Sequence, residues 1–223
     1  MRPDEIKAAK DIYRDSKEWY LEDGGKASVS KRLIELCVSR AGKHILDLGC
    51  AVGNYCVELK SLGFECTGVD VNNAYIEIAR KKGVEAFTVQ GILPFKDRSF
   101  DTVIIFEVLE HVQDPEPVIK EALRVARKNI LITVPDNSQF ETLKSAGLTY
   151  EHMLERDHVN FFTKSSLEGL LKANAARCDV WEGDPVFIHH LLPWYFRKPL
   201  TVLELIGLMK PTFYNRLYAE CII

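Results

Sequence analysis

The stretch Ile-Leu-Asp-Leu-Gly-Cys-Ala-Val-Gly, residues 45–53, joins a short apolar strand to a turn that contains two glycines. A helix is predicted directly after it, over 53–62, and Gly63 ends that helix. Glycine lets the backbone of such a turn approach a ligand closely, and the first N–H groups of the helix suit a carboxylate or a phosphate. The stretch therefore predicts a ligand site between a strand and a helix.

The next predicted strand, over 64–70, ends on Asp70, 21 residues after Gly49. A carboxylate in that place can accept hydrogen bonds from both hydroxyls of a ribose. The nicotinamide fingerprint requires glycine at positions 49, 51 and 54, and this chain has Gly49, Ala51 and Asn54. No Gly-Lys-Ser/Thr follows, which excludes a P-loop. The alternative to a ligand site is a structural turn of a generic α/β protein.

Helices and strands alternate along most of the chain, which predicts a parallel α/β sheet. Further strands are predicted over 84–89, 101–106, 129–134, 180–182 and 215–223, and further helices over 4–22, 28–40, 72–82, 114–125 and 163–174. Two stretches interrupt the alternation, namely 136–162 and 185–211. Long connections in compact domains are usually lids or binding loops.

Composition narrows the classes of protein. The chain has 223 residues with 47% hydrophobic and 27% charged side chains, which is typical of a globular domain. Its net charge of −3 disfavours nucleic acid as a partner. No signal peptide or membrane span is predicted. None of the six cysteines forms a Cys-x-x-Cys pair, so we expect reduced thiols in a cytoplasmic protein.

Several motifs in order resemble one family. Residues 45–53 resemble the first motif of class I S-adenosylmethionine (SAM)-dependent methyltransferases, and Gly68-Val69-Asp70-Val71 is similar to the second. Residues 93–95, 99–103, 106–112 and 161–163 resemble the small-molecule branch, which includes the ubiquinone- and menaquinone-biosynthesis methyltransferases and the type 11 and type 23 methyltransferase domains. The resemblance extends over about 30–183.

The resemblance implies a three-layer αβα sandwich with a Rossmann-like, seven-stranded, mostly parallel sheet whose last strand is antiparallel. It also implies a single domain over 1–223. Within that domain we expect an N-terminal helical lid (1–40), a SAM-binding core (41–183) that carries an insertion (136–162), and an apolar helical insertion (185–211) before the last strand.

The same resemblance implies SAM as cofactor and S-adenosylhomocysteine as its product. Asp47 would help to place the methionine end, Gly49 and Gly53 would approach the cofactor, Asp70 would hold the ribose, and Val71 would flank the adenine. The full set of expected cofactor residues is Asp47, Gly49, Cys50, Gly53, Asn54, Tyr55, Asp70, Val71, Gln90, Gly91 and Phe106. Two positions depart from the family, since Ala51 replaces a glycine and Gln90-Gly91 stands where an acid often contacts the adenine.

The residues after the strand over 101–106 are candidates for catalysis, because ligands of open parallel sheets bind beyond the carboxyl ends of the strands. Glu107, Glu110 and His111 share one face if this segment is helical. An imidazole such as that of His111 can accept a proton from an acceptor hydroxyl near neutral pH, and Glu107 is the second candidate catalytic residue. The alternative is that both side chains are structural.

Glu-x-x-Glu-His followed by a later histidine also resembles the metal site of some O-methyltransferases that act on quinone precursors or RNA ribose ends. Here Glu107, Glu110, His111 and His158 would hold a divalent ion that lowers the pKa of the acceptor hydroxyl. Metal-free relatives carry a similar Leu-Glu-His-Val, so the metal-free alternative stays open.

The apolar stretch 185–211 has two interpretations. It is either a helical cover or dimer contact, or the wall of a pocket for an apolar or lipid-linked acceptor near a membrane. We therefore expect a SAM-dependent methyltransferase, monomeric or homodimeric, that acts on a hydroxyl of a small molecule such as a sugar, a quinone-like ring or a lipid-linked intermediate. The alternative is a non-catalytic SAM-binding or protein-interaction module that docks through this stretch.

Overall fold

A computed structural model describes residues 29–145 and 157–223. The helix predicted over 4–22 lies outside these residues, as does most of the lid predicted over 1–40. Part of the insertion predicted over 136–162 is also outside them.

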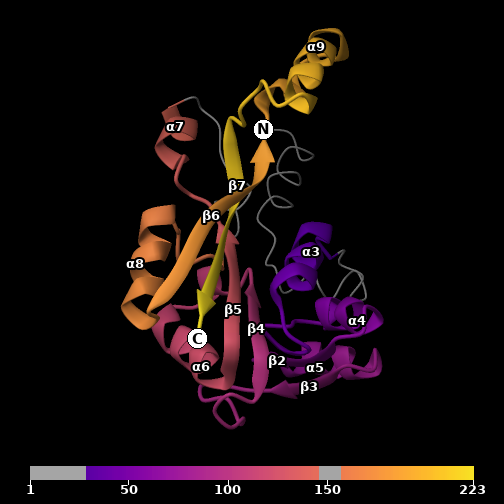
Figure 1. Ribbon diagram of the computed structural model, residues 1–223, viewed down its shortest axis with the longest axis vertical. Helices are drawn as coiled ribbons and strands as arrows, with labels where there is room; N and C mark the ends of the chain where they lie inside the picture. The colour runs from indigo at the N-terminus through magenta and orange to yellow at the C-terminus, as the bar shows by residue number, and fades with distance from the viewer. Residues whose placement is uncertain (1–28, 146–156) are drawn as a thin grey trace, which may run out of the picture.

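The described residues form one seven-stranded sheet with the order β3-β2-β1-β4-β5-β7-β6 (Figure 1). Its strands are β1 (His44–Leu48), β2 (Glu65–Asp70), β3 (Glu85–Thr88), β4 (Phe100–Phe106), β5 (Ala126–Pro135), β6 (Arg177–Val186) and β7 (Phe213–Ile222). β7 runs antiparallel to both of its neighbours, and all pairs that do not involve β7 are parallel. The predicted sheet is therefore confirmed.

Helices cover both faces of the sheet, as an apolar central strand requires. They are α3 (Lys31–Arg40), α4 (Asn54–Ser61), α5 (Asn73–Lys81), α6 (Pro115–Val125), α7 (Phe140–Ser145), α8 (Lys164–Asn174) and α9 (Trp194–Leu205), with short 3₁₀ turns η1 (Leu109–His111) and η3 (Ile188–Leu191). Along β4, Val103 and Ile105 pack into the core formed with α6 and α8. Ile104 and Phe106 pack into the opposite core, formed with α3, α4 and α5. This alternation confirms the three layers.

Helix boundaries follow local chemistry where the sequence supplies caps. The Asp114 side chain accepts a hydrogen bond from the N–H of Glu116 at the start of α6, and proline follows it at the first helical position. Thr163 and Ser166 form a reciprocal capping box at the start of α8. Both helices therefore begin where they were predicted to begin.

The last hairpin differs from the prediction. β6 was expected over 180–182 only, but it pairs with β7 from Arg177 to Val186. The strand lacks a clear alternation of apolar residues, because it contains charged residues, Gly183 and Pro185. Pairing with β7 along its length stabilises it. Cross-strand register also places Cys178 directly opposite Cys221, where they form a disulfide. The expectation of six reduced thiols is therefore wrong for this pair, and it is confirmed for the four buried cysteines 37, 50, 56 and 66.

Residues 187–212 leave the sheet between β6 and β7 and carry η3 and α9. The base of this excursion is closed by hydrogen bonds from Thr212 N to Val186 O (2.8 Å) and from Ile188 N to Thr212 Oγ1 (3.1 Å). Figure 1 shows α9 beyond the ends of the two strands, away from the body of the sheet. α9 has no buried residue, although it carries Trp194, Tyr195 and Phe196. Among the described residues, no helix combines the length and the apolar character needed to cross a bilayer.

Candidate active site

The turn after β1 is built from three left-handed residues, since φ is 85° at Gly49, 44° at Ala51 and 76° at Gly53. A Cβ at Gly49 would overlap the Val108 side chain, so this position requires glycine for space as well as for conformation. Ala51 keeps the backbone that the family usually builds with glycine, at a cost of roughly 1 kcal/mol. The turn is tied to β2 by hydrogen bonds from the N–H groups of Gly49 and Cys50 to Val69 O.

Asp70 connects this turn to the end of β2. Its Oδ2 accepts a hydrogen bond from Ala51 N (2.9 Å), and its Oδ1 accepts one from Asn72 N (2.8 Å). Burial raises the pKa of Asp70, and these backbone N–H groups oppose the rise. The carboxylate therefore holds the turn in place and keeps further lone pairs for a ligand.

Two exposed apolar side chains follow the ends of β2 and β3. Val89 N donates to Asp70 O (2.9 Å), which brings Gln90 and Gly91 beside the end of β2. Val71, directly after Asp70, is exposed, and Ile92, directly after Gly91, is 79% exposed. Ile92 was not among the expected cofactor residues. Its only signal in the sequence is a branched apolar residue directly after Gln90-Gly91.

Asp47 lies two residues before Gly49 and is only 3% exposed. Burial raises the pKa of Asp47 to about 7, and the hydrogen bond from Cys56 Sγ (3.5 Å) opposes the rise. Cys66 Sγ in turn donates to Cys56 Sγ (2.9 Å). An acid this far from water is costly unless a cation or donors meet it, which makes Asp47 a candidate ligand group.

The other expected cofactor residues divide into side chains and backbone. Cys50 is buried in the core and its N–H already donates to Val69 O, so neither group is directed at a cofactor. The Asn54 side chain accepts a hydrogen bond from Lys82 Nζ (2.6 Å), so we expect Asn54 to act through its backbone N–H. The Tyr55 ring meets Phe106 edge-on at 5.6 Å between centroids. The Tyr55 hydroxyl accepts a hydrogen bond from Ser30 N (3.1 Å), which connects the start of α3 to this site.

Glu107 does not join Glu110 and His111. Its backbone is left-handed with φ of 54°, and the 3₁₀ turn η1 covers only Leu109–His111. The prediction of one helical face for all three residues is therefore wrong. The Glu107 carboxylate instead accepts a hydrogen bond from Arg216 Nε on β7 (2.9 Å).

Arg216 is a residue that sequence reasoning missed, because only the pairing of β5 with β7 brings it to Glu107. It also pairs with Asp184 of β6, whose carboxylate binds Arg32 of α3 (2.6 Å) and the Tyr218 hydroxyl (3.2 Å). Burial opposes the charge of Arg216, but Glu107 and Asp184 outweigh it and raise the pKa. Asp184 has φ of 54° and lines an open cavity of about 530 Å³ between α3 and the last hairpin.

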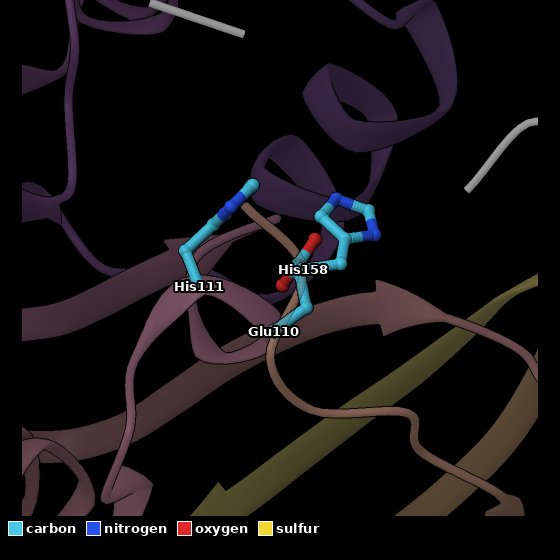
Figure 2. A group of neighbouring side chains, drawn as sticks. All are labelled: Glu110, His111 and His158. Carbon is cyan, nitrogen blue, oxygen red and sulfur yellow. The ribbon is translucent and has the colours of Figure 1, made fainter. Parts of the chain in front are cut away.

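Glu110, His111 and His158 do come together (Figure 2). One donor atom from each residue lies within 4.8 Å of the others, and the two imidazole rings are 4.6 Å apart between centroids. Glu110 is 1% exposed and His158 is 9% exposed. Three of the four expected metal ligands therefore share one place, next to the carboxyl end of β4.

Backbone bonds hold the segment of His158 against η1. Val159 N and Asn160 N both donate to Glu110 O, at 2.8 and 3.0 Å. The Asn160 side-chain amide donates to Leu109 O (3.1 Å). The ring of His111 is oriented by Asp157, since its Nδ1 lies 3.3 Å from the main-chain O in a hydrogen bond and 3.4 Å from Oδ2 of the carboxylate. Residues 157–160 thus lie against the turn that follows β4, as a site built from these residues requires.

A comparison with protein-family models matches residues 25–176 to a methyltransferase domain. The chain belongs to this methyltransferase family. The resemblance to class I SAM-dependent methyltransferases is thereby confirmed, and membership implies binding of SAM.

Two curated relatives and one solved structure show the range of similarity. The chain is 38% identical over 106 residues to norajmaline N-methyltransferase of Rauvolfia serpentina, which covers 43% of this chain and 36% of that protein. It is 34% identical over 94 residues to the ubiquinone biosynthesis O-methyltransferase of Hahella chejuensis, covering 39% and 40%. The matches therefore span less than half the length of these relatives.

A SAM-dependent methyltransferase from Archaeoglobus fulgidus has the same fold, with a TM-score of 0.64 and 19% identity over 86% of this chain and 91% of that one.

Proposed function

We propose that this methyltransferase transfers the methyl group of SAM to a hydroxyl oxygen of a small molecule, and that Glu110, His111 and His158 hold a divalent cation at the acceptor side. One observation carries the proposal. Three residues from η1 and from the connection after β5 converge beside the expected cofactor turn, with donor atoms within 4.8 Å of one another.

The residues around the turn fit SAM. Asp70 offers a carboxylate to the ribose hydroxyls, Val71 and Ile92 offer apolar surface to the adenine, and the buried Asp47 offers a negative charge to the ammonium of the methionine end. The left-handed turn leads into α4, whose first N–H groups suit a carboxylate. When bound, SAM supplies an electrophilic methyl group on a sulfonium.

The cluster beyond the turn fits a divalent cation, because two imidazoles and one carboxylate form a mixed nitrogen and oxygen donor set. A cation held there lowers the pKa of a hydroxyl that binds to it. In the metal-free alternative, His111 accepts the proton itself while Asp157 orients the ring and stabilises its positive charge. With or without a metal, Glu107 acts indirectly, because its carboxylate helps to hold Arg216 beside the site.

A nitrogen acceptor is the second candidate, because one of the relatives is an N-methyltransferase. The exposed aromatic residues of α9 support an acceptor with apolar character, quinone-like or lipid-linked, and contact of this helix with a membrane surface belongs to the same proposal. A non-catalytic SAM-binding module remains the alternative to an enzyme.

The test measures S-adenosylhomocysteine formation with a catechol, a sugar and an aryl-alkyl amine as acceptors, before and after treatment with a chelator. We expect turnover with a hydroxyl acceptor, loss with the chelator, and recovery with Mn²⁺ or Zn²⁺. His111→Ala should lower turnover about a hundred-fold or more. SAM affinity measured by calorimetry should stay unchanged. His44→Ala, which changes a histidine outside the site, is the matched control.

Three results would overturn parts of the proposal. Turnover that ignores the chelator but needs His111 would favour the metal-free base. Turnover with the amine alone would favour N-methylation. Tight SAM binding without turnover of any acceptor would favour the non-catalytic module.

A further inference from the structure

A second cluster of possible ligands lies in the excursion between β6 and β7, away from the residues assigned above. We propose that His189, His190 and Glu204 form a Zn²⁺ site that fixes α9 against η3. The two histidines come from η3 and the glutamate from α9. One donor atom of each residue lies within 4.8 Å of the others.

Both histidines direct the same ring nitrogen at the same oxygen. His189 Nε2 is 3.1 Å from Glu204 Oε2, and His190 Nε2 is 2.8 Å from it. Donor atoms that share one zinc ion at about 2.0–2.1 Å lie roughly 3.0–3.5 Å from one another. Two of the three donor pairs are therefore already close to the spacing that one ion imposes, and the donor atoms of the two imidazoles lie within 4.8 Å of each other.

Burial makes this cluster unusual. His189 is only 2% exposed, and neither of its ring nitrogens makes a hydrogen bond within the described part of the chain. Buried polar atoms are almost always paired, because removing them from water without a partner costs free energy. His190 Nε2 does form a hydrogen bond to Glu204 Oε2, whereas His189 Nε2 lies 3.1 Å from the same oxygen without the geometry of a hydrogen bond. A cation between the three side chains would bind Nε2 of both histidines and the Glu204 carboxylate, and would give the buried Nε2 of His189 a partner.

The surroundings keep the donors in position. The ring of Phe187 lies 5.7 Å from His189 and 5.9 Å from His190 between centroids, and the two imidazoles are 4.5 Å apart. The hydrogen bonds at the base of the excursion hold both ends of the segment. Glu204 stands near the end of α9, so an ion at this place would connect η3 to the far end of that helix.

The donor set selects the ion. Two imidazole nitrogens and one carboxylate suit zinc and its neighbours, whereas Mg²⁺ prefers oxygen ligands in an octahedral arrangement. The three ligands carry one negative charge when both imidazoles are neutral, which matches a divalent cation. A fourth position stays available to water or to a donor on a bound molecule.

The test titrates untagged, chelator-treated full-length chain with Zn²⁺ in a calorimeter. His111→Ala removes a ligand from the other cluster and serves as the background. In that background we expect one zinc ion to bind. Adding Glu204→Gln or His190→Ala should weaken it at least a hundred-fold, because loss of a ligand exceeds the effect of losing a supporting residue. Adding His44→Ala should change nothing.

A second measurement follows the Tm with and without Zn²⁺ and Mg²⁺. Zn²⁺ should raise the Tm in the His111→Ala background but not after Glu204→Gln, and Mg²⁺ should raise it in neither. Glu204 and His190 are partly exposed, so circular dichroism should show folded variants. Equal zinc affinity in all variants, absence of zinc binding, or equal binding of Mg²⁺ would overturn the proposal. None of these results depends on methyl transfer.

Discussion

The turn after β1 and the excursion after β6 both lie at the carboxyl ends of parallel strands, yet they are stabilised by different means. The turn is held by main-chain hydrogen bonds to β2 and by the Asp70 carboxylate. The excursion is held by two bonds at its base and by a cluster of side chains between η3 and α9. A site built from the backbone can be recognised in the sequence by a short local pattern of glycines and acids. A cluster of side chains corresponds only to residues that are scattered along the sequence.

Among the changes considered, Gly49→Val is expected to have the largest effect on the turn after β1. The left-handed φ of 85° and the overlap with Val108 both oppose a β-branched side chain. We expect a loss of roughly 3–5 kcal/mol in the free energy of unfolding and no SAM binding, measured by denaturant titration and calorimetry. Gly63→Val is the matched control, because Gly63 has φ of 90° with nothing close to an added Cβ. Equal losses in both variants would contradict the close-approach argument.

The buried acid of the same region predicts a pH dependence. The folded pKa of Asp47 is about 7, above its ordinary value of 3.8, so between these values the folded chain binds a proton that the unfolded chain has released. Stability without cofactor should therefore fall as the pH rises from about 4 to 7 and then level off, by at most about 4 kcal/mol.

Asp47→Asn should remove this slope in denaturant titrations at several pH values. SAM affinity of the unchanged protein should fall below pH 7 if Asp47 meets the ammonium of SAM as proposed, because its carboxylate becomes protonated there. An unchanged slope in Asp47→Asn would assign the titration to another group.

A disulfide joins β6 and β7, the two strands that carry the excursion. Cys178 and Cys221 are 43 residues apart, and a cross-link over a loop of this length stabilises by about 3–4 kcal/mol. Cys178→Ser/Cys221→Ser should lose that amount in denaturant titration, and a reductant should produce the same loss in the unchanged protein. Cys37→Ser, a change in a free buried cysteine, should respond to the reductant as the unchanged protein does. A reductant without effect would show that the pair is not bonded.

The smallest effect expected is that of Asp70→Ala on the cofactor. Loss of its charge-assisted bonds to the ribose should weaken SAM binding by about 2–3 kcal/mol, or roughly 30- to 150-fold in calorimetry. The same carboxylate accepts bonds from Ala51 N and Asn72 N, so unfolding should also become easier by about 1–2 kcal/mol. Asp70→Asn keeps an acceptor and should lie between the two proteins. Unchanged affinity in Asp70→Ala would remove this residue from the site.

Sequence patterns predicted the sheet and the turn because both depend on near neighbours in the chain. Each of these features depends on a few consecutive residues: the strand before Gly49, the acid at the end of β2, and the caps of α6 and α8. The same logic failed after β4. A helix over 107–111 is compatible with the side chains present, but Glu107 takes a left-handed backbone as Arg216 of a distant strand binds its carboxylate.

The remaining misses share a physical cause, which is dependence on strand register. Cys178 meets Cys221, and Arg216 reaches Asp184, only after β6 and β7 have paired in one particular way. The spacing of these residues along the chain does not predict that pairing. His158 could be placed near His111 from the resemblance to known metal sites, whereas nothing in the chain's order connects Glu204 to His189.

The position of β7 has a consequence for synthesis on the ribosome. β7 lies between β5 and β6, and β6 joins the sheet through β7 alone. While residues 213–222 are still inside the ribosomal tunnel, β6 therefore has no partner strand and one edge of β5 remains open. Strands β1 to β5 and the turn after β1 can fold during translation. β6 and the excursion that carries α9 can join the sheet only after β7 has emerged. During that interval the nascent chain presents an unpaired strand together with the apolar side chains of α9, which is the kind of surface that chaperones recognise.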